Sequence, residues 1–406
     1  MNPSLQLILQ LAILIFATKA AGLLSMRLKQ PAVLGELLAG LILGPTVLGI
    51  FQWPVFAQGH TEEIVTALAE IGVILLMFMA GLEVDTGEML KSGHIALGAG
   101  FLGVLVPLIL GAGLSLLFNH ALTGSIFIGL ILTATSVSIS AQTLLELGAI
   151  KSRVGVALLG AAVVDDVLGI LLLSVFLAMT GADGGGNLIG VLAGMIAFFA
   201  VAIAFGLWLL PRLTHHIHLL PISEGVVSWA IVITLLFAFS AEAFGQVAAI
   251  TGAFLAGVFL GRTHLRREIV RGMHTIAYAF FVPLFLVSIG LKVNARNLDG
   301  ATVAFMLLLT LLAVVAKVVG AGLGARLARM PWADSLRVGI GMISRGEVGL
   351  IIASIGLQQG LIDANVFASV VMMVLLTTLV TPLLLRRVIS HKESSHVEHI
   401  HTGARS

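Results

Sequence analysis

The stretch VGVALLGAAVVDDVLGILLLSVFLA, residues 154–178, decides the fold class of this 406-residue chain. Its 25 residues form an apolar run that is interrupted near the middle by Asp165 and Asp166. A run of this length is typical of a membrane-spanning helix. An ionised carboxylate at the centre of such a helix costs roughly 2.5 to 3.5 kcal/mol, so two adjacent ones indicate an ion or proton path.

The composition of the whole chain agrees with a membrane protein. Hydrophobic residues make up 59% of the chain and charged residues only 10%. The apolar surface of such a chain exceeds what one soluble core can bury. The net charge of +2 gives no basis for nucleic-acid binding. The absence of cysteine excludes disulfides and thiolate metal sites, and no cofactor is predicted.

Apolar runs of about 20 residues predict about 13 transmembrane spans, and hence an all-α polytopic membrane protein. The approximate spans are 4–24, 31–50, 64–82, 95–118, 122–147, 154–180, 187–210, 223–241, 246–261, 275–291, 300–325, 334–358 and 364–385. They form a single transmembrane unit over 1–390, followed by a cytoplasmic tail over 391–406.

The basic residues are unevenly distributed between the two sets of alternate loops. One set contains Arg27, Lys29, Lys91, Lys151, Arg153, Arg212, Arg262, Arg266, Arg267, Arg271, Arg326, Arg329, Arg337, Arg386, Arg387, Lys392 and Arg405. The other set contains Lys292 and Arg296. The positive-inside rule therefore predicts a cytoplasmic C-terminus and an external N-terminus.

The two halves of the chain resemble each other. GELLAGLILG at 35–44 matches GAFLAGVFLG at 252–261, GLEVD at 81–85 matches GLKVN at 290–294, and SIFIG at 125–129 lies like SLRVG at 335–339. Seven spans separate each pair, so matched segments cross the bilayer in opposite directions. This predicts an inverted repeat, with the first copy over 1–180, a linker helix over 187–210 and the second copy over 223–388.

Lys317 is the predicted partner of one carboxylate. Asp165 lies 12 residues after Arg153 and Lys317 lies nine before Arg326, which puts them roughly 18 and 13 Å from the same membrane edge. Adjacent helix residues point about 100° apart, so one Asp can pair with Lys317 while the other faces a water-filled cavity. Geometry does not say which, and a purely structural ion pair is the alternative. Two carboxylates this close titrate as a unit, which suits cation and proton exchange.

Corresponding interruptions appear in the two halves. TATSVSIS at 133–140 is a polar, β-branched run, and ISRGEVG at 343–349 places a Gly on either side of a charged pair. Such pairs indicate two broken helices that cross at a binding site, where Arg345 and Glu347 can compensate the half-helix dipoles. Alternatively, the hydroxyls of 133–140 bond back to their own helix. Glu36, Glu70, Glu83 and Glu242 are interpreted as interfacial or packing residues.

Five segments, in this order along the chain, resemble bacterial sodium/proton antiporters of the monovalent cation:proton antiporter-2 family, NapA-like members in particular. They are AEIGVILLMFMAGLEVD at 69–85, the Asp165–Asp166 pair, AFFVPLFLVSIGLKVN at 279–294, AKVVGAGLGARL at 316–327 and ISRGEVGLIIA at 343–353. The related Kef-type potassium systems usually carry a soluble nucleotide-binding domain, which is not expected here.

The resemblance implies an NhaA/NapA-like fold and a homodimer in the cytoplasmic membrane of a bacterium or archaeon. Core helices over about 95–180 and 300–385 would move against dimerisation helices over about 1–82 and 223–291. Asp166 would be the principal carboxylate for cation and proton, and Asp165 would pair with Lys317 when no cation is bound. The crossover residues would be Thr133, Thr135 and Ser136 in the first half, with Arg345 and Glu347 in the second.

The sequence therefore predicts a secondary antiporter that exchanges Na⁺ or Li⁺ for protons. The resemblance implies that the Asp165–Asp166 pair marks electrogenic exchange, with more protons than cations per cycle. A K⁺/proton antiporter on the same fold is the closest alternative. An intramembrane aspartyl protease is disfavoured because its two carboxylates usually come from separate helices. A cation channel is disfavoured because the chain has inverted repeats and no recognisable selectivity filter.

Overall fold

The computed structural model describes residues 3–28, 30–53, 56, 61–83, 86–118, 120–180, 188–217, 224–291 and 300–402. Within these ranges all regular secondary structure is helical. The first half contains α1 (Pro3–Arg27), α2 (Ala32–Leu43), η1 (Ile50–Gln52), α3 (Thr61–Glu83), α4 (Thr86–Leu117), α5 (Leu122–Thr133), α6 (Val137–Glu146) and α7 (Arg153–Thr180). Next come α8 (Leu188–Ala204), η2 (Phe205–Leu209) and α9 (Leu210–Ile217).

The second half contains α10 (Gly225–Ala243), α11 (Ala249–Leu260), α12 (Arg266–Ile276), η3 (Ala277–Phe281), α13 (Val282–Leu291), α14 (Gly300–Leu327), α15 (Trp332–Gly341), α16 (Glu347–Gln358) and α17 (Ala364–Thr402). In the described part of the chain, 10 helices are long and apolar enough to cross a membrane, and three shorter apolar helices accompany them. Each predicted span corresponds to one of these, so the predicted all-α polytopic fold is confirmed.

Some span limits differ from the prediction. The span predicted over 31–50 ends as a helix at Leu43, because Gly44 caps the last turn through its amide to Gly40 O and Pro45 follows. The span predicted from 275 begins at Arg266, since the segment Arg266–Ile276 is amphipathic and buries Ile269 and Met273. Similarly, α17 continues past the predicted end at 385.

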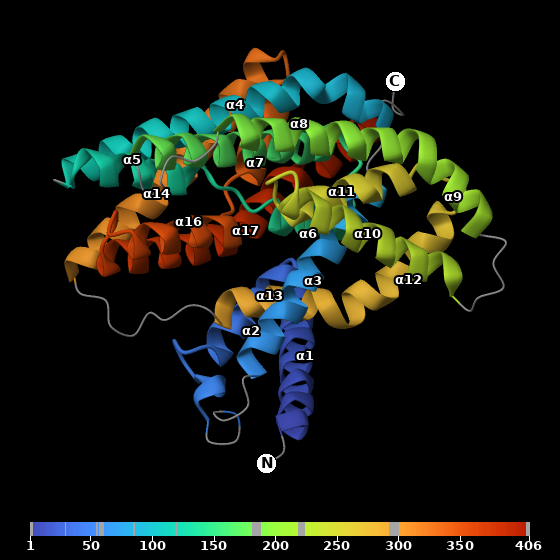
Figure 1. The fold of residues 1–406 in the computed structure, drawn as a ribbon, viewed down its shortest axis with the longest axis horizontal. Coiled ribbons are helices and arrows are strands. Elements are labelled where there is room, and N and C mark those ends of the chain that lie inside the picture. The colour runs from blue at the N-terminus through green and yellow to red at the C-terminus, as the bar shows by residue number, and fades with distance from the viewer. Residues whose placement is uncertain are drawn as a thin grey trace.

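The helices pack in two groups. The first is centred on the crossing of α4 with α14, against which α5, α7, α15 and α17 pack. In the second, α3 packs on α11 and α13, and α2 packs on α1 and α13. Figure 1 shows α4, α7 and α8 side by side in the upper part and α1, α2 and α3 with α13 in the lower part. The α8 helix contacts both α7 and α10, and its role as a linker between two repeats stays a prediction. A moving core and a dimerising scaffold stay predictions.

Two close helix crossings explain the sequence repeat. Gly40 of α2 meets Gly290 of α13, and Gly257 of α11 meets Gly81 of α3. A Cβ at Gly40 would lie 2.1 Å from the Val287 carbonyl oxygen, and one at Gly257 would lie 2.2 Å from that of Phe78. In the repeat, Gly40 corresponds to Gly257 and Gly290 corresponds to Gly81. Each crossing is therefore the counterpart of the other, as an inverted repeat requires. The matched glycines therefore mark places where two backbones touch.

These crossings predict a stability effect. Gly257→Ala inserts a Cβ against the backbone of α3, and overpacking of this kind costs about 1–3 kcal/mol. We expect a lower melting temperature of the detergent-purified protein, followed by fluorescence-detected size-exclusion chromatography after heating. Gly113→Ala in α4 is the control, because nothing lies within 4 Å of its added Cβ. Equal melting temperatures for the two variants would contradict the backbone contact.

Candidate functional site

Asp165 and Lys317 form an ion pair deep inside the first helix group. Lys317 Nζ lies 2.5 Å from Asp165 Oδ1, and the two side chains are 0% and 1% exposed. Asp165 comes from the middle of α7 and Lys317 from α14. Helical rise predicted that these two residues lie at similar depth. The structure thus brings this predicted pair together. Pairing offsets part of the cost of burying each charge alone.

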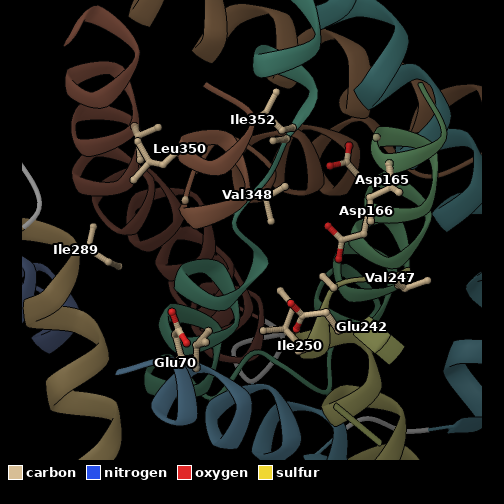
Figure 2. Close-up of a pocket in the computed structure, with 18 of the residues that line it drawn as sticks. Glu70, Asp165, Asp166, Glu242, Val247, Ile250, Ile289, Val348, Leu350 and Ile352 are labelled. Carbon is tan, nitrogen blue, oxygen red and sulfur yellow. The ribbon is translucent and has the colours of Figure 1, made fainter. Parts of the chain in front are cut away.

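Asp166 points to a different side of α7 from its neighbour. Its Oδ2 accepts a hydrogen bond of 3.1 Å from the Thr251 hydroxyl of α11. Unlike the buried Asp165, Asp166 is only partly buried. Figure 2 shows its carboxylate directed towards the side of Glu242 and Ile250. Of the two carboxylates, Asp165 is therefore held by the buried ammonium and Asp166 is presented to a cavity.

The predicted break in span 5 is present. The α5 helix ends at Thr133, Ala134 and Ser136 are extended, and α6 begins at Val137. In the second half, α15 ends at Gly341 and α16 begins at Glu347. The two interruptions touch, because the Ser136 amide donates to Ser344 O at 2.8 Å and the Ser344 hydroxyl donates to Ser136 O at 2.5 Å. They cross as the repeat symmetry predicts.

Arg345 carries the positive charge of this crossover. It is 1% exposed, and its Nη1 donates to the carbonyl oxygen of Ala134 at 2.6 Å, just past the end of α5. Carbonyls at a helix C-terminus carry partial negative charge, so a guanidinium there compensates the dipole of the half-helix. The Thr378 hydroxyl holds the Arg345 carbonyl at 2.7 Å. The side chain of Glu347, the other predicted compensating residue, lies outside the described part of the structure.

The three hydroxyl residues predicted at the first crossover have different surroundings. Thr133 lines the cavity, and its hydroxyl donates to Leu130 O at 2.7 Å. Thr135 donates weakly to Thr133 O at 3.4 Å, and the Ser136 hydroxyl lies 3.0 Å from that of Ser138. All three are buried. Of the three, the structure therefore brings only Thr133 to the cavity beside Asp166.

A cavity of about 960 Å³ leads away from the two aspartates. Its lining includes Asp165, Asp166, Glu70, Glu242 and Ser288. Glu70 and Glu242, interpreted from the sequence as interfacial or packing residues, line this cavity instead (Figure 2). The reason is that the first half of α3 and the end of α10 border the space in front of α7, which hydropathy along the chain does not show. The other two acidic residues of that group form ion pairs, Glu83 with Lys151 at 2.6 Å and Glu36 with Lys19 at 3.4 Å.

The cavity lies at one end of the molecule. Its residues include some from the first half of α3, the end of α10, the start of α11 and the end of α13. The basic loops that hold Lys151, Arg262 and Arg266 lie at the opposite ends of the neighbouring helices. The carboxylate pair is thus connected to the face that carries few basic residues.

Thr251 is the site residue that the sequence analysis missed. It directly precedes the repeat match at 252–261, within an apolar run, so hydropathy does not single it out. The available signal was its position in the first turn of a helix, where a hydroxyl is not committed to an earlier carbonyl of that helix.

An all-helical membrane protein with crossed, interrupted helices and carboxylates facing a one-sided cavity has the architecture of a secondary transporter. Comparison with known proteins gives its family. Residues 12–390 match the transmembrane sodium/hydrogen exchanger family, and the chain belongs to it. This confirms the predicted cation:proton antiporter class and excludes the protease alternative.

Full-length relatives agree with this assignment. The Na⁺/H⁺-K⁺ antiporter GerN of Bacillus cereus is 40% identical over 386 residues, 95% of this chain and 97% of the relative. The Na⁺/H⁺ antiporter of Enterococcus hirae is 36% identical over 378 residues, 93% and 96% of the two chains. The sodium proton antiporter MjNhaP1 of Methanocaldococcus jannaschii has the same fold, with a TM-score of 0.71, 19% identity and coverage of 93% and 94%.

The buried ion pair makes a prediction about stability. Lys317→Met leaves Asp165 buried without its counter-charge, which costs about 3–5 kcal/mol. We expect a lower melting temperature for this variant and recovery of most of the loss when Asp165→Asn is added. The control is Lys151→Met, since the Lys151 and Glu83 side chains are 57% and 21% exposed and exposed pairs contribute about 0–1 kcal/mol. A double variant as unstable as the single one would show that the pairing is not the cause.

Proposed function

We propose that this chain exchanges a monovalent cation, Na⁺ or Li⁺, for protons across the cytoplasmic membrane of a bacterium or archaeon. The observation that carries the proposal is that the two aspartates have different surroundings. Asp165 is paired with the buried Lys317, while Asp166 faces the cavity. A carboxylate at that position can bind either a cation or a proton, and the names of GerN and the Enterococcus hirae relative support the same activity.

Competition between the two ions produces the exchange. An empty site that combines two ionised aspartates with the single Lys317 has a net negative charge that is costly to move across the apolar barrier, whereas a site that has bound a cation or proton is closer to neutral. If the cation also recruits Asp165, Lys317 loses its counter-charge, and releasing a proton removes an unpaired buried ammonium. This second proton accounts for electrogenic exchange, with more protons than cations per cycle.

The positive-inside rule gives the orientation we propose. The basic loops face the cytoplasm, so the N-terminus is external and the C-terminus is cytoplasmic. The cavity lies at the ends of the helices away from those loops, and therefore opens to the outside. Thr133, beside Asp166 in this cavity, is proposed as a further oxygen donor near the ion, while Thr135, Ser136 and Arg345 hold the crossover itself.

Alternating access requires the first helix group to move against the second. Two contacts join the groups on the basic side. Glu146 of α6 accepts from the amides of Ala32 and Val33 at 2.8 and 3.2 Å, and Lys151 pairs with Glu83 of α3 at 2.6 Å. We propose that these contacts close the cytoplasmic side in the present state and break when the site turns inward. The second group would form the homodimer contact and stay in place.

Ion exchange itself gives the direct test. Everted membrane vesicles holding a proton gradient should lose part of it on addition of Na⁺ or Li⁺. Asp166→Asn should abolish this response, because its neutral amide neither binds a proton reversibly nor compensates a cation. Failure of Na⁺, Li⁺ and K⁺ alike would refute antiport, and wild-type exchange by the variant would move the site elsewhere. A response to K⁺ alone would favour the K⁺/proton activity, for which the name of GerN provides the precedent.

The proposed movement can be blocked chemically. The chain has no cysteine, so a pair introduced by Lys151→Cys and Glu83→Cys reacts without background. We expect a short thiol cross-linker to stop exchange, and cleavage of the linker to restore it. Asp334→Cys with Arg337→Cys is the matched control, because these residues pair within one helix, α15. Undiminished exchange after complete cross-linking of the first pair would rule out separation of the groups at that point.

A further inference from the structure

We propose that Thr251 is a positioning residue for the transported cation, and that it acts on the external face only. Its hydroxyl donates to Asp166 and ties the ion site to α11 while the cavity is open. The inference rests on the proposed function, since it concerns the affinity for the ion that is exchanged. According to this inference, Thr251 increases the affinity for the cation at the external face of the membrane and not at the cytoplasmic face.

The bond made by Thr251 differs from those of other buried threonines. Five of these donate to a carbonyl four residues earlier in their own helix, at 2.5 to 2.9 Å, namely Thr18, Thr143, Thr234, Thr377 and Thr381. Thr378 donates to another segment, but its acceptor is the backbone carbonyl of Arg345 and not a carboxylate. Thr251 is the third residue of α11, and the carbonyl four positions earlier, that of Val247, precedes the helix. Its hydroxyl is 3.1 Å from Asp166 Oδ2 instead, although the residue is only 2% exposed.

This hydrogen bond crosses between the two helix groups. Asp166 lies on α7, which packs on α4, whereas Thr251 lies on α11, which packs on α3 and α10. Movement of one group against the other therefore separates the two residues. The bond can exist only in a state that resembles the present one, with the cavity on the side of Glu242 and Ser288.

The inverted repeat does not supply a second hydroxyl for the other face. Aligning GAFLAGVFLG at 252–261 with GELLAGLILG at 35–44 places Thr251 opposite Leu34. A leucine side chain cannot donate a hydrogen bond to a carboxylate. The start of α2 is instead bonded to Glu146, through the amides of Ala32 and Val33. At this point the helices α2 and α11 correspond by the repeat, but the groups that bond to their first turns differ.

The hydroxyl favours the form of Asp166 that binds a cation. A hydrogen bond donated to a carboxylate stabilises its ionised form relative to its protonated form. It also restricts the rotation of the side chain, which keeps the carboxylate pointing into the cavity (Figure 2). Without the hydroxyl, protons compete more strongly for Asp166, so a higher external concentration of Na⁺ is needed to displace them.

The test compares the KM for Na⁺ from each face at one fixed pH. Right-side-out vesicles present the external face to added Na⁺, and everted vesicles present the cytoplasmic face. We expect Thr251→Val, which keeps the shape and removes the hydroxyl, to raise the external KM about tenfold, within the range for hydrogen bonds to charged groups. The cytoplasmic KM should change less than about twofold, because the bond is absent in that state.

Two further variants separate positioning from structure. Thr251→Ser keeps the hydroxyl and should restore the external KM. Thr234→Val is the matched control, because Thr234 is 0% exposed and bonds Ala230 O within its own helix α10. It should leave the KM at both faces unchanged. If Thr251→Val yields too little protein, Thr251→Ala is measured in its place against the same serine variant.

The outcomes are distinct from those of the antiport test. Lack of exchange in the unmodified protein would refute the proposed function. Normal exchange combined with an unchanged external KM in Thr251→Val would overturn the inference alone. Equal KM changes at both faces would also overturn it, as would a serine variant that behaves like the valine variant.

Discussion

The burial of charge in a membrane is the constraint on which this structure depends. Asp165 and Lys317 have almost no exposed surface, and each is tolerable because the other lies 2.5 Å away. Arg345 follows the same rule with a different partner, since backbone carbonyls released by the broken helix accept from its guanidinium. The crossed interruptions place these charges side by side between α7, α14 and α5. The other carboxylate, Asp166, faces the cavity, and this difference from Asp165 is the basis of the proposed exchange.

Much of this could be predicted from the sequence because simple rules govern it. Hydropathy gives the spans, since every backbone group in lipid must be satisfied within a helix. Helical rise alone placed Asp165 and Lys317 at similar depth before any packing was known. The repeat pointed to Gly40, Gly257 and their partners, where a Cβ would meet a backbone. In each case the requirement that shapes the local sequence also determines the long-range contact. The local sequence was therefore sufficient to predict that contact.

The cavity and its contacts could not be predicted in this way. Glu70 lies in the first half of α3 and Glu242 near the end of α10, where a carboxylate is equally consistent with an interface. Only the packing of α3 and α10 around α7 makes them line a cavity. The environment of Thr251 is also tertiary, because a threonine in an apolar run usually bonds to its own helix. Choosing Asp166 over Asp165 for the cavity likewise needed the resemblance or the structure, since adjacent residues on a helix are geometrically equivalent until their neighbours are known.

The two ends of the repeat show how a symmetric fold can favour a direction. At the first turn of α2 a carboxylate from the other group, Glu146, accepts two backbone amides. At the first turn of α11 the other group again supplies a carboxylate, Asp166, but its partner is the Thr251 side chain. The first contact does not involve the proposed ion site, whereas the second involves Asp166, the proposed transport carboxylate. In the proposed orientation and mechanism, opening of the external side would therefore couple to the occupancy of the site, while the cytoplasmic contact would respond only to the movement of the helices.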